Sequence, residues 1–151
     1  MPRRTPLTLL TLSLTAVAGA TVALAAAAPA TAGPSTVLRT AMTGAAEVPG
    51  PGDPDGKGNG VVRIDRSSGE ICVVITTHGT APLRAGHIHE EAPGAESGPV
   101  VVPLTQVSDT KFKGCAVAPA VAEGLLSMPS EYYLHVHNAE FPGGALRGDL
   151  G

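Results

Sequence analysis

The chain has no tryptophan, and aromatic residues make up only 3% of its 151 residues. A core must therefore be built from Val, Ile, Leu and Ala, a composition that suits tightly packed sheets. The length allows one domain and not two. No serine lies in a G-x-S-x-G setting, and no glycine-rich phosphate loop with its lysine occurs. The sequence thus offers no pattern of a serine hydrolase or of a nucleotide-binding loop.

Positive charge is also scarce. Ten Lys and Arg residues stand against thirteen Asp and Glu residues, and two of the ten, Arg3 and Arg4, lie in a segment that we expect to be removed. This acidic excess argues against nucleic acid or an anionic membrane surface as a partner. Past Gly33 no apolar run is long enough to span a bilayer, so we expect no membrane insertion after cleavage.

Residues 1–32 follow the three-part order of a secretory signal peptide. The arginine pair is followed by an uncharged apolar run, and Ala30 and Ala32 occupy the small-residue positions of a cleavage site. We therefore expect cleavage after Ala32 and a secreted domain of residues 33–151. A transmembrane anchor is the alternative, because the apolar run is long enough to span. The arginines match the twin-arginine signal only weakly, so the export route stays open.

Only two cysteines are present, Cys72 and Cys115. An exported protein meets oxidising conditions, so we expect one disulfide between them. Two buried free thiols are the alternative. A bridge that closes a loop of about 40 residues stabilises a fold by about 3–4 kcal/mol.

The remaining sequence consists of short segments with strand character, separated by Gly, Pro and Asp. We expect a long loop at 44–60 and one helix at 119–129. The expected strands are 36–43, 61–66, 70–78, 83–90, 99–104, 111–118, 131–139 and 145–150. This pattern predicts an all-β fold, an antiparallel Greek-key β-sandwich or barrel with one short helix.

Four of the five histidines occupy two H-x-H units, one in each of two expected strands: His87 and His89, and His135 and His137. Because side chains alternate along a strand, each pair shares one face, while Ile88, Leu134 and Val136 point to the core. If the two strands are neighbours, the four imidazoles form one patch. Several imidazoles without a thiolate suit copper or zinc.

Two interpretations of this histidine patch remain open. In the first, it holds a copper or zinc ion, and Glu90, Glu91 and Glu140 are nearby carboxylates that orient the rings. In the second, the histidines are ordinary residues of an exposed strand face, and the patch binds an extracellular protein or polymer without a metal. We expect His78 to lie in a loop.

Two further segments carry charged or oxygen-bearing side chains that could form a calcium site or a catalytic site. Asp53, Asp55 and Asn59 resemble part of a calcium loop, but Ile64 stands where an EF-hand loop needs its glutamate, so a plain solvated turn region is favoured. In the last strand, Arg147 and Asp149 share a face, and we expect a structural ion pair rather than catalytic groups.

Three stretches together resemble the CHRD domain family, which occurs in chordin and in exported microbial proteins. They are "TAMTGAAEVPGPG", "HIHEEAPGAESGPVVVPL" and "HVHNAEFPGGALRGDL", and the resemblance covers residues 36–151. Gly50 stands where the family usually has a second proline. The resemblance implies a compact extracellular β domain, a cysteine pair as in microbial members, and no established enzyme activity.

A weaker similarity links "GHIHE" to a copper-binding strand of copper–zinc superoxide dismutase, also a Greek-key β protein. Only His87 and His89 match that pattern. The bridging histidine and the zinc loop have no counterpart, so the similarity does not imply redox catalysis. We therefore expect a binding module rather than an enzyme, and a copper- or zinc-binding protein is the second hypothesis.

Overall fold

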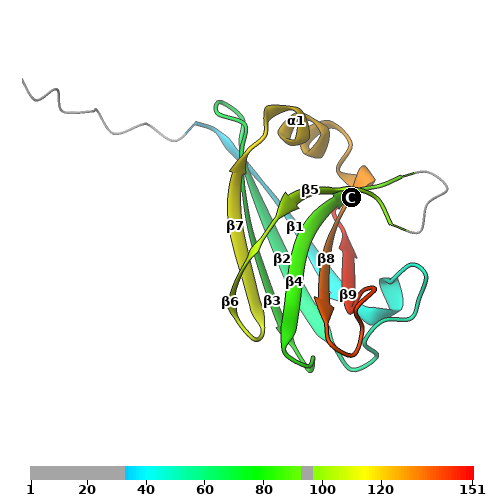
Figure 1. Ribbon diagram of the computed structural model, residues 1–151. Helices are drawn as coiled ribbons and strands as arrows, with labels where there is room; N and C mark the ends of the chain where they lie inside the picture. Colours follow the sequence, from blue (N-terminus) through cyan, green and yellow to red (C-terminus); the bar gives the residue numbers. More distant parts are fainter. Residues whose placement is uncertain (1–32, 93–96) are drawn as a thin grey trace, which may run out of the picture. The chain divides into compact units, whose positions relative to one another are not determined.

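The computed structural model describes residues 33–92 and 97–151, and the predicted signal peptide lies outside them. Nine antiparallel strands form one sheet in the order β5-β4-β8-β9-β1-β2-β3-β7-β6 (Figure 1). The strands are β1 (Ser35–Thr43), β2 (Lys57–Asp65), β3 (Glu70–His78), β4 (Leu83–Glu90), β5 (Val100–Pro103), β6 (Thr105–Ser108), β7 (Lys111–Val117), β8 (Tyr132–Asn138) and β9 (Leu146–Asp149). The predicted all-β antiparallel fold is confirmed.

The sheet is nearly closed because its two outer strands, β5 and β6, follow each other in the chain. Only Leu104 separates them, and its backbone N–H donates to the Gly86 carbonyl in β4 at 3.0 Å. Further along, the Gln106 side chain donates to the Leu83 carbonyl at 2.8 Å. One continuous segment thus pairs first with β4 and then with β7, so neither strand presents a long free edge.

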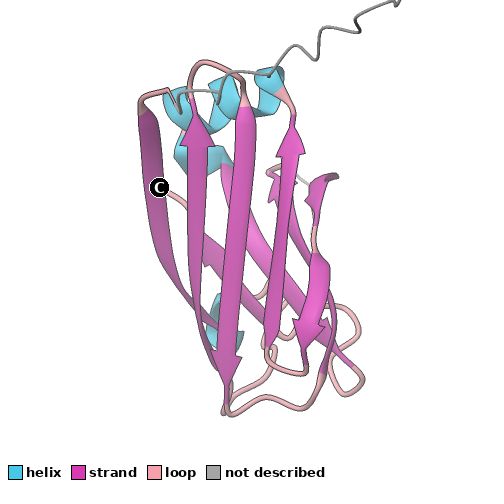
Figure 2. Ribbon diagram, turned by 90° about the vertical axis from the view of Figure 1, so that its left-hand side faces the viewer, coloured by secondary structure: helices cyan, strands magenta, loops and turns pink. Residues whose placement is uncertain are grey.

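The core is aliphatic, as the composition predicts. Ile88, Leu134 and Val136 are fully buried on the inner face of β4 and β8. The helix α1 (Pro119–Ser127) lies across one end of the strands, where it buries Ala122 and Leu125 (Figures 1 and 2). It is followed by the short 3-10 helix η2 (Pro129–Glu131). The predicted helix at 119–129 is confirmed for its first nine residues.

The prediction of an unstructured loop at 44–60 is wrong at both ends. A 3-10 helix, η1 (Gly44–Ala46), starts the segment, and β2 already begins at Lys57. The glycines of β2 serve close packing rather than turning, since a Cβ at Gly60 would overlap the Leu134 side chain. The sequence also gave no signal for β6, whose four residues are all exposed and show no alternation.

Cys72 and Cys115 lie directly opposite each other on β3 and β7 and form the predicted disulfide. Their Cα atoms are 4.1 Å apart. Since the expected strands 70–78 and 111–118 carry the cysteines, correct pairing of these strands brings the sulfurs together. Among residues 33–92 and 97–151, no helix has the length and apolarity needed to cross a membrane.

Candidate metal centre

The two H-x-H units lie side by side, as neighbouring strands of the sheet. In the β4–β8 pair, His87 is opposite His135, Ala85 is opposite His137 and His89 is opposite Tyr133. The imidazoles share the face of the sheet that points away from the aliphatic core. The ring centroids of His87 lie 5.4 Å from those of both His89 and His137, and the centroids of His135 and His137 are 4.2 Å apart.

This face is covered rather than open to solvent, which differs from the exposed strand face of the second interpretation. His89 is 5% exposed and His135 is 4% exposed, and Tyr133 beside them is buried. Three connecting segments contact the cluster: the segment after η1 through Glu47, residues 97–99 before β5 through Gly98, and the β8–β9 connection through Pro142. Strand alternation could predict the direction of the side chains but not the loops that cover them.

Each covering segment supplies one acceptor to one imidazole. The Gly98 carbonyl is 2.8 Å from Nδ1 of His89, and the Pro142 carbonyl is 3.1 Å from Nδ1 of His137. A carbonyl oxygen only accepts, so each of these Nδ1 atoms carries the proton. The free lone pair is then on Nε2 of His89 and of His137. Metal-binding histidines are usually held in this way, with the non-ligating N–H bonded to a carbonyl or carboxylate.

Several ring nitrogens on this face are buried and have no hydrogen-bond partner among the described residues: Nδ1 of His87, Nε2 of His89 and Nδ1 of His135. Buried polar atoms nearly always have a hydrogen-bond partner in folded proteins, so a group of unsatisfied nitrogens calls for an explanation. One ring nitrogen from each of His87, His89 and His137 lies within 4.8 Å of the other two. Tetrahedral binding of zinc needs nitrogens about 3.3 Å apart, which follows from bonds of about 2.0–2.1 Å. The three side chains would therefore have to move closer together to bind an ion.

The pKa values of His87, His89 and His137 are lowered, which favours the neutral form that binds metals. Burial first, and then the neighbouring rings of His135 and His87, lower the pKa of His137 to about 4. Burial is also the first cause that lowers the pKa of His87 and of His89. Protonation would place a positive charge next to other buried imidazoles. A metal ion would instead accept the lone pairs of the unpaired ring nitrogens.

His135, the fourth predicted ligand, lies in the cluster but outside the convergent trio. Its Nε2 lies 2.8 Å from Oε2 of Glu47, a residue in the segment after η1 that is itself 7% exposed. The sequence analysis did not single out Glu47, because it lies 88 residues from His135 in a segment predicted to be a loop. Its one signal is the "EVPG" stretch within the family-like opening of the domain.

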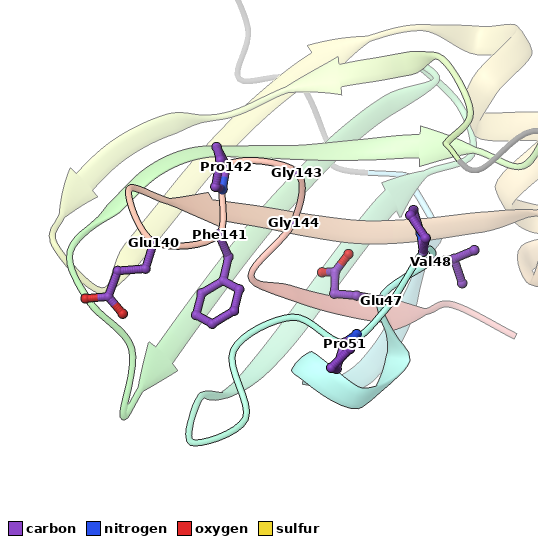
Figure 3. A pocket seen from close by; sticks show the side chains of 9 residues that line it. Glu47, Val48, Pro51, Glu140, Phe141, Pro142, Gly143 and Gly144 are labelled. Atoms are coloured by element: carbon purple, nitrogen blue, oxygen red, sulfur yellow. The ribbon is translucent and has the colours of Figure 1, made fainter.

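The Glu47–His135 contact depends on a glycine at position 144. A Cβ on Gly144 would overlap both Oε2 of Glu47 and Nε2 of His135. Figure 3 shows the Glu47 carboxylate beside the Gly143–Gly144 segment, in a hollow of about 250 Å³. Only a residue without a side chain allows the β8–β9 connection to pass this close to the pair.

Arg147 supports the cluster from the side of Tyr133. The Tyr133 ring stacks on His89 at 5.0 Å and 13°, and the guanidinium carbon of Arg147 lies 3.7 Å from the centre of the Tyr133 ring. Arg147 also pairs with Asp149 in its own strand, as expected, and with Glu91 beyond the end of β4. The arginine therefore joins β9 to β4 and holds the aromatic ring against His89.

The structure places Glu90 and Glu140 away from the imidazoles. Glu90 belongs to the opposite face of β4, where its Oε1 accepts a long hydrogen bond of 3.4 Å from the Tyr132 hydroxyl. Glu140 is exposed, and Figure 3 shows its carboxylate turned away from Glu47. The carboxylate that contacts an imidazole is thus Glu47, and neither Glu90 nor Glu140 forms such a contact among the described residues.

The segment that resembles part of a calcium loop is a structural turn. Asp53 is 5% exposed, and its Oδ1 accepts the backbone N–H groups of Asp55 and Gly56. Its Oδ2 accepts a bond of 3.4 Å from the buried side chain of Asn138, at the end of β8. Asn59 lies in β2, where it is exposed, and is not part of this turn. The turn therefore anchors the covering segment to the histidine strand.

Comparison with known protein families agrees with this architecture. The sequence model of the CHRD domain matches residues 38–150. The chain belongs to the CHRD domain family. The match extends from β1 to the residue after β9, so it includes every residue of the histidine cluster of this CHRD domain. No curated protein and no solved structure matched the chain.

Proposed function

We propose that this CHRD domain is a secreted binding module that holds one copper or zinc ion through His87, His89 and His137. The observation that supports it is the convergence of three neutral imidazoles, each offering a lone pair within 4.8 Å of the others. Nitrogen ligands without thiolate suit Cu(II) and Zn(II). The carbonyls of Gly98 and Pro142 would keep the non-ligating nitrogens protonated.

In this proposal, His135 and Glu47 position the site and do not ligate the ion. Glu47 fixes the proton on Nε2 of His135, and the His135 ring packs against His137 and His89. A metal would serve to stabilise the covered face or to bind a further ligand. Secretion itself is part of the proposal, supported by the predicted signal peptide and by the disulfide between Cys72 and Cys115.

Elemental analysis tests the proposal. The protein, purified without a histidine tag, is dialysed with equimolar Cu(II) or Zn(II) and then against a metal-free buffer. We expect one ion per chain in the unaltered protein, and loss of that ion in the His87→Ala, His89→Ala and His137→Ala variants. The matched control is His78→Ala, which removes the exposed histidine at the end of β3 and should retain the ion.

The alternative function is a module that binds an extracellular protein or polymer without a metal. It is distinguished by two results: no stoichiometric ion in the unaltered protein, or full retention of the ion in the His87→Ala and His137→Ala variants. Either result would reject the metal site. An ion that binds only the folded protein raises its melting temperature, so removal of the ion should lower it, and an unchanged melting temperature would favour the metal-free module.

A further inference from the structure

A groove of about 440 Å³ opens beside two of the three proposed ligands. His87 and His137 form part of its wall, together with Arg84, Ala85, Ala139 and Pro142. Both histidines are partly exposed, whereas His89 and His135 are buried. Solvent and small molecules therefore reach the imidazole cluster from the side of His87 and His137.

Coordination chemistry leaves one position for such a molecule. Three histidines supply three of the four ligands that zinc prefers, and sites with three protein ligands keep an exchangeable fourth one. His135 does not fill that position in this geometry, because neither of its ring nitrogens lies with the convergent three, and its Nε2 is hydrogen-bonded to Glu47. The groove is where an external ligand gains access.

The charge at the groove selects an anion. Three neutral imidazoles would leave the double positive charge of the ion uncompensated, and Arg84 adds a further positive charge to the wall. No carboxylate lines this groove among the described residues. The rest of the wall is mostly apolar and is formed by Ala85, Ala139 and Pro142, together with the polar residue Asn138. A ligand that combines an anionic head with a short apolar tail matches both parts.

We propose that the groove is a binding site for small aliphatic carboxylates. This inference rests on the metal site proposed above. The carboxylate completes the coordination of the ion and lies beside the guanidinium of Arg84, and its alkyl tail packs on Ala85, Ala139 and Pro142. The tail has to be short because the apolar part of the wall consists of only these three residues.

The test uses the Co(II)-loaded protein, whose visible absorption changes when the fourth ligand changes. Acetate, propionate and butyrate are titrated separately at constant ionic strength, with butanol as the uncharged control. We expect saturable spectral changes with all three carboxylates and none with butanol. Affinity should rise roughly two- to fourfold per methylene, since a fully buried methylene contributes about 0.8 kcal/mol.

Two variants examine the role of the wall. Arg84→Gln removes a charge from the groove without touching a proposed ligand, so it should retain one Co(II) per chain and bind butyrate several-fold more weakly. Arg39→Gln is the matched control, because it removes the same charge from an exposed position on β1, separated from β4 by β8 and β9. It should bind butyrate as the unaltered protein does.

The outcomes separate this inference from the proposed function. Protein that binds Co(II) stoichiometrically but shows no spectral change with any carboxylate would overturn the inference and leave the metal site intact. Equal affinity for acetate and butyrate would overturn it too, since the apolar wall would then have no role. Failure to bind Co(II) or any other ion would instead reject the metal site itself.

Discussion

A single carboxylate, Glu47, illustrates how residues distant in sequence define the histidine cluster. Glu47 is buried, its Oε2 accepts the N–H of His135, and its Oε1 has no partner among the described residues. A buried carboxylate is costly unless it is hydrogen-bonded, so this contact holds the segment after η1 against β8. The geometry of the cluster therefore depends on a residue that contributes no ligand.

Replacement of Gly144 by alanine should break this contact. The new methyl group would overlap Glu47 and His135, which have to move apart. We expect a loss of about 1–3 kcal/mol in the free energy of unfolding, as for other insertions into packed sites. Urea denaturation measures this loss. The imidazole N–H signal of His135 in nitrogen-correlated NMR spectra should also broaden or disappear as the proton begins to exchange with water.

Gly143 provides the control for this substitution. A Cβ at Gly143 meets nothing within 4 Å. Gly143→Ala should therefore change the stability by no more than about 0.5 kcal/mol, as is usual at unconstrained surface positions. If the two alanine variants were equally stable, Gly144 would not be needed for the close approach of the β8–β9 connection.

At the residue scale, the sequence predicted which face of the sheet each side chain points to, but it did not predict the hydrogen-bond acceptors of the imidazoles. Alternation placed Ile88, Leu134 and Val136 in the core, and the structure buries all three completely. The acceptors at Glu47, Gly98 and Pro142 were not predictable in this way. They lie in connecting segments, where no periodicity relates a residue to its neighbours in space.

At the scale of elements, strand pairing decides which side chains meet. The sequence predicted strands at 83–90 and 131–139, and β4 and β8 match them closely. The metal hypothesis assumed that these two strands are neighbours, because a single sequence does not show which strands pair. The structure shows β4 and β8 as neighbours with His87 opposite His135. The strand β2 was predicted too short because Gly58 and Gly60 read as turn residues, although they permit close packing against Met42 and Leu134.

The disulfide acts on the β3–β7 pair and should stabilise the fold without affecting the histidine cluster. It joins residues 43 positions apart, and loss of such a cross-link costs about 3–4 kcal/mol in the chain-entropy description. The double variant Cys72→Ala/Cys115→Ala should therefore unfold at a lower guanidinium concentration. Its ion content should equal that of the unaltered protein, because β3 and β7 contribute no residue to the histidine cluster.

Two measurements control this prediction. Thiol titration of unfolded, unreduced protein should detect no free thiol, and two titratable thiols would contradict the disulfide. The unaltered protein treated with a reductant should have the same unfolding midpoint as the double variant. A large difference between these two midpoints would indicate that the alanines, and not the missing bond, cause the loss of stability.

At the scale of the whole domain, the described residues form an almost closed antiparallel sheet with a helix at one end. The inner face supplies an aliphatic core, and the outer face of β4 and β8 carries a second, polar cluster under three connecting segments. Periodicity and composition predicted the aliphatic core. The polar cluster depends on loop conformations. These are set by particular contacts, such as the hydrogen bond from Asn138 to Asp53, rather than by a repeating pattern.

The covered histidines should make the stability of the metal-free protein depend on pH. The pKa values of His87, His89 and His137 are lowered in the folded protein, to about 4 for His137, whereas an unfolded histidine has a pKa of about 6.5. Below pH 6.5 the unfolded chain therefore binds protons that the folded protein does not, so stability falls as the pH falls from 6.5 toward 4. Since His87 and His137 are partly exposed, we expect a total loss of only about 1–2 kcal/mol between pH 7.5 and pH 5.

Urea denaturation in the presence of a chelator at pH 7.5, 6.5, 5.5 and 5 measures this dependence. Asp65 does not interfere in this range: hydrogen bonds from Ser67 and Ser68 lower its pKa to about 2, so its contribution is lost only between its unfolded value near 3.8 and 2. His137→Gln should flatten the dependence, while the exposed His78→Gln should leave it unchanged. A stability that stayed constant or rose between pH 7.5 and pH 5 would mean that the imidazoles accept protons freely in the folded protein. The cluster would then not be the desolvated set of lone pairs on which a metal site depends.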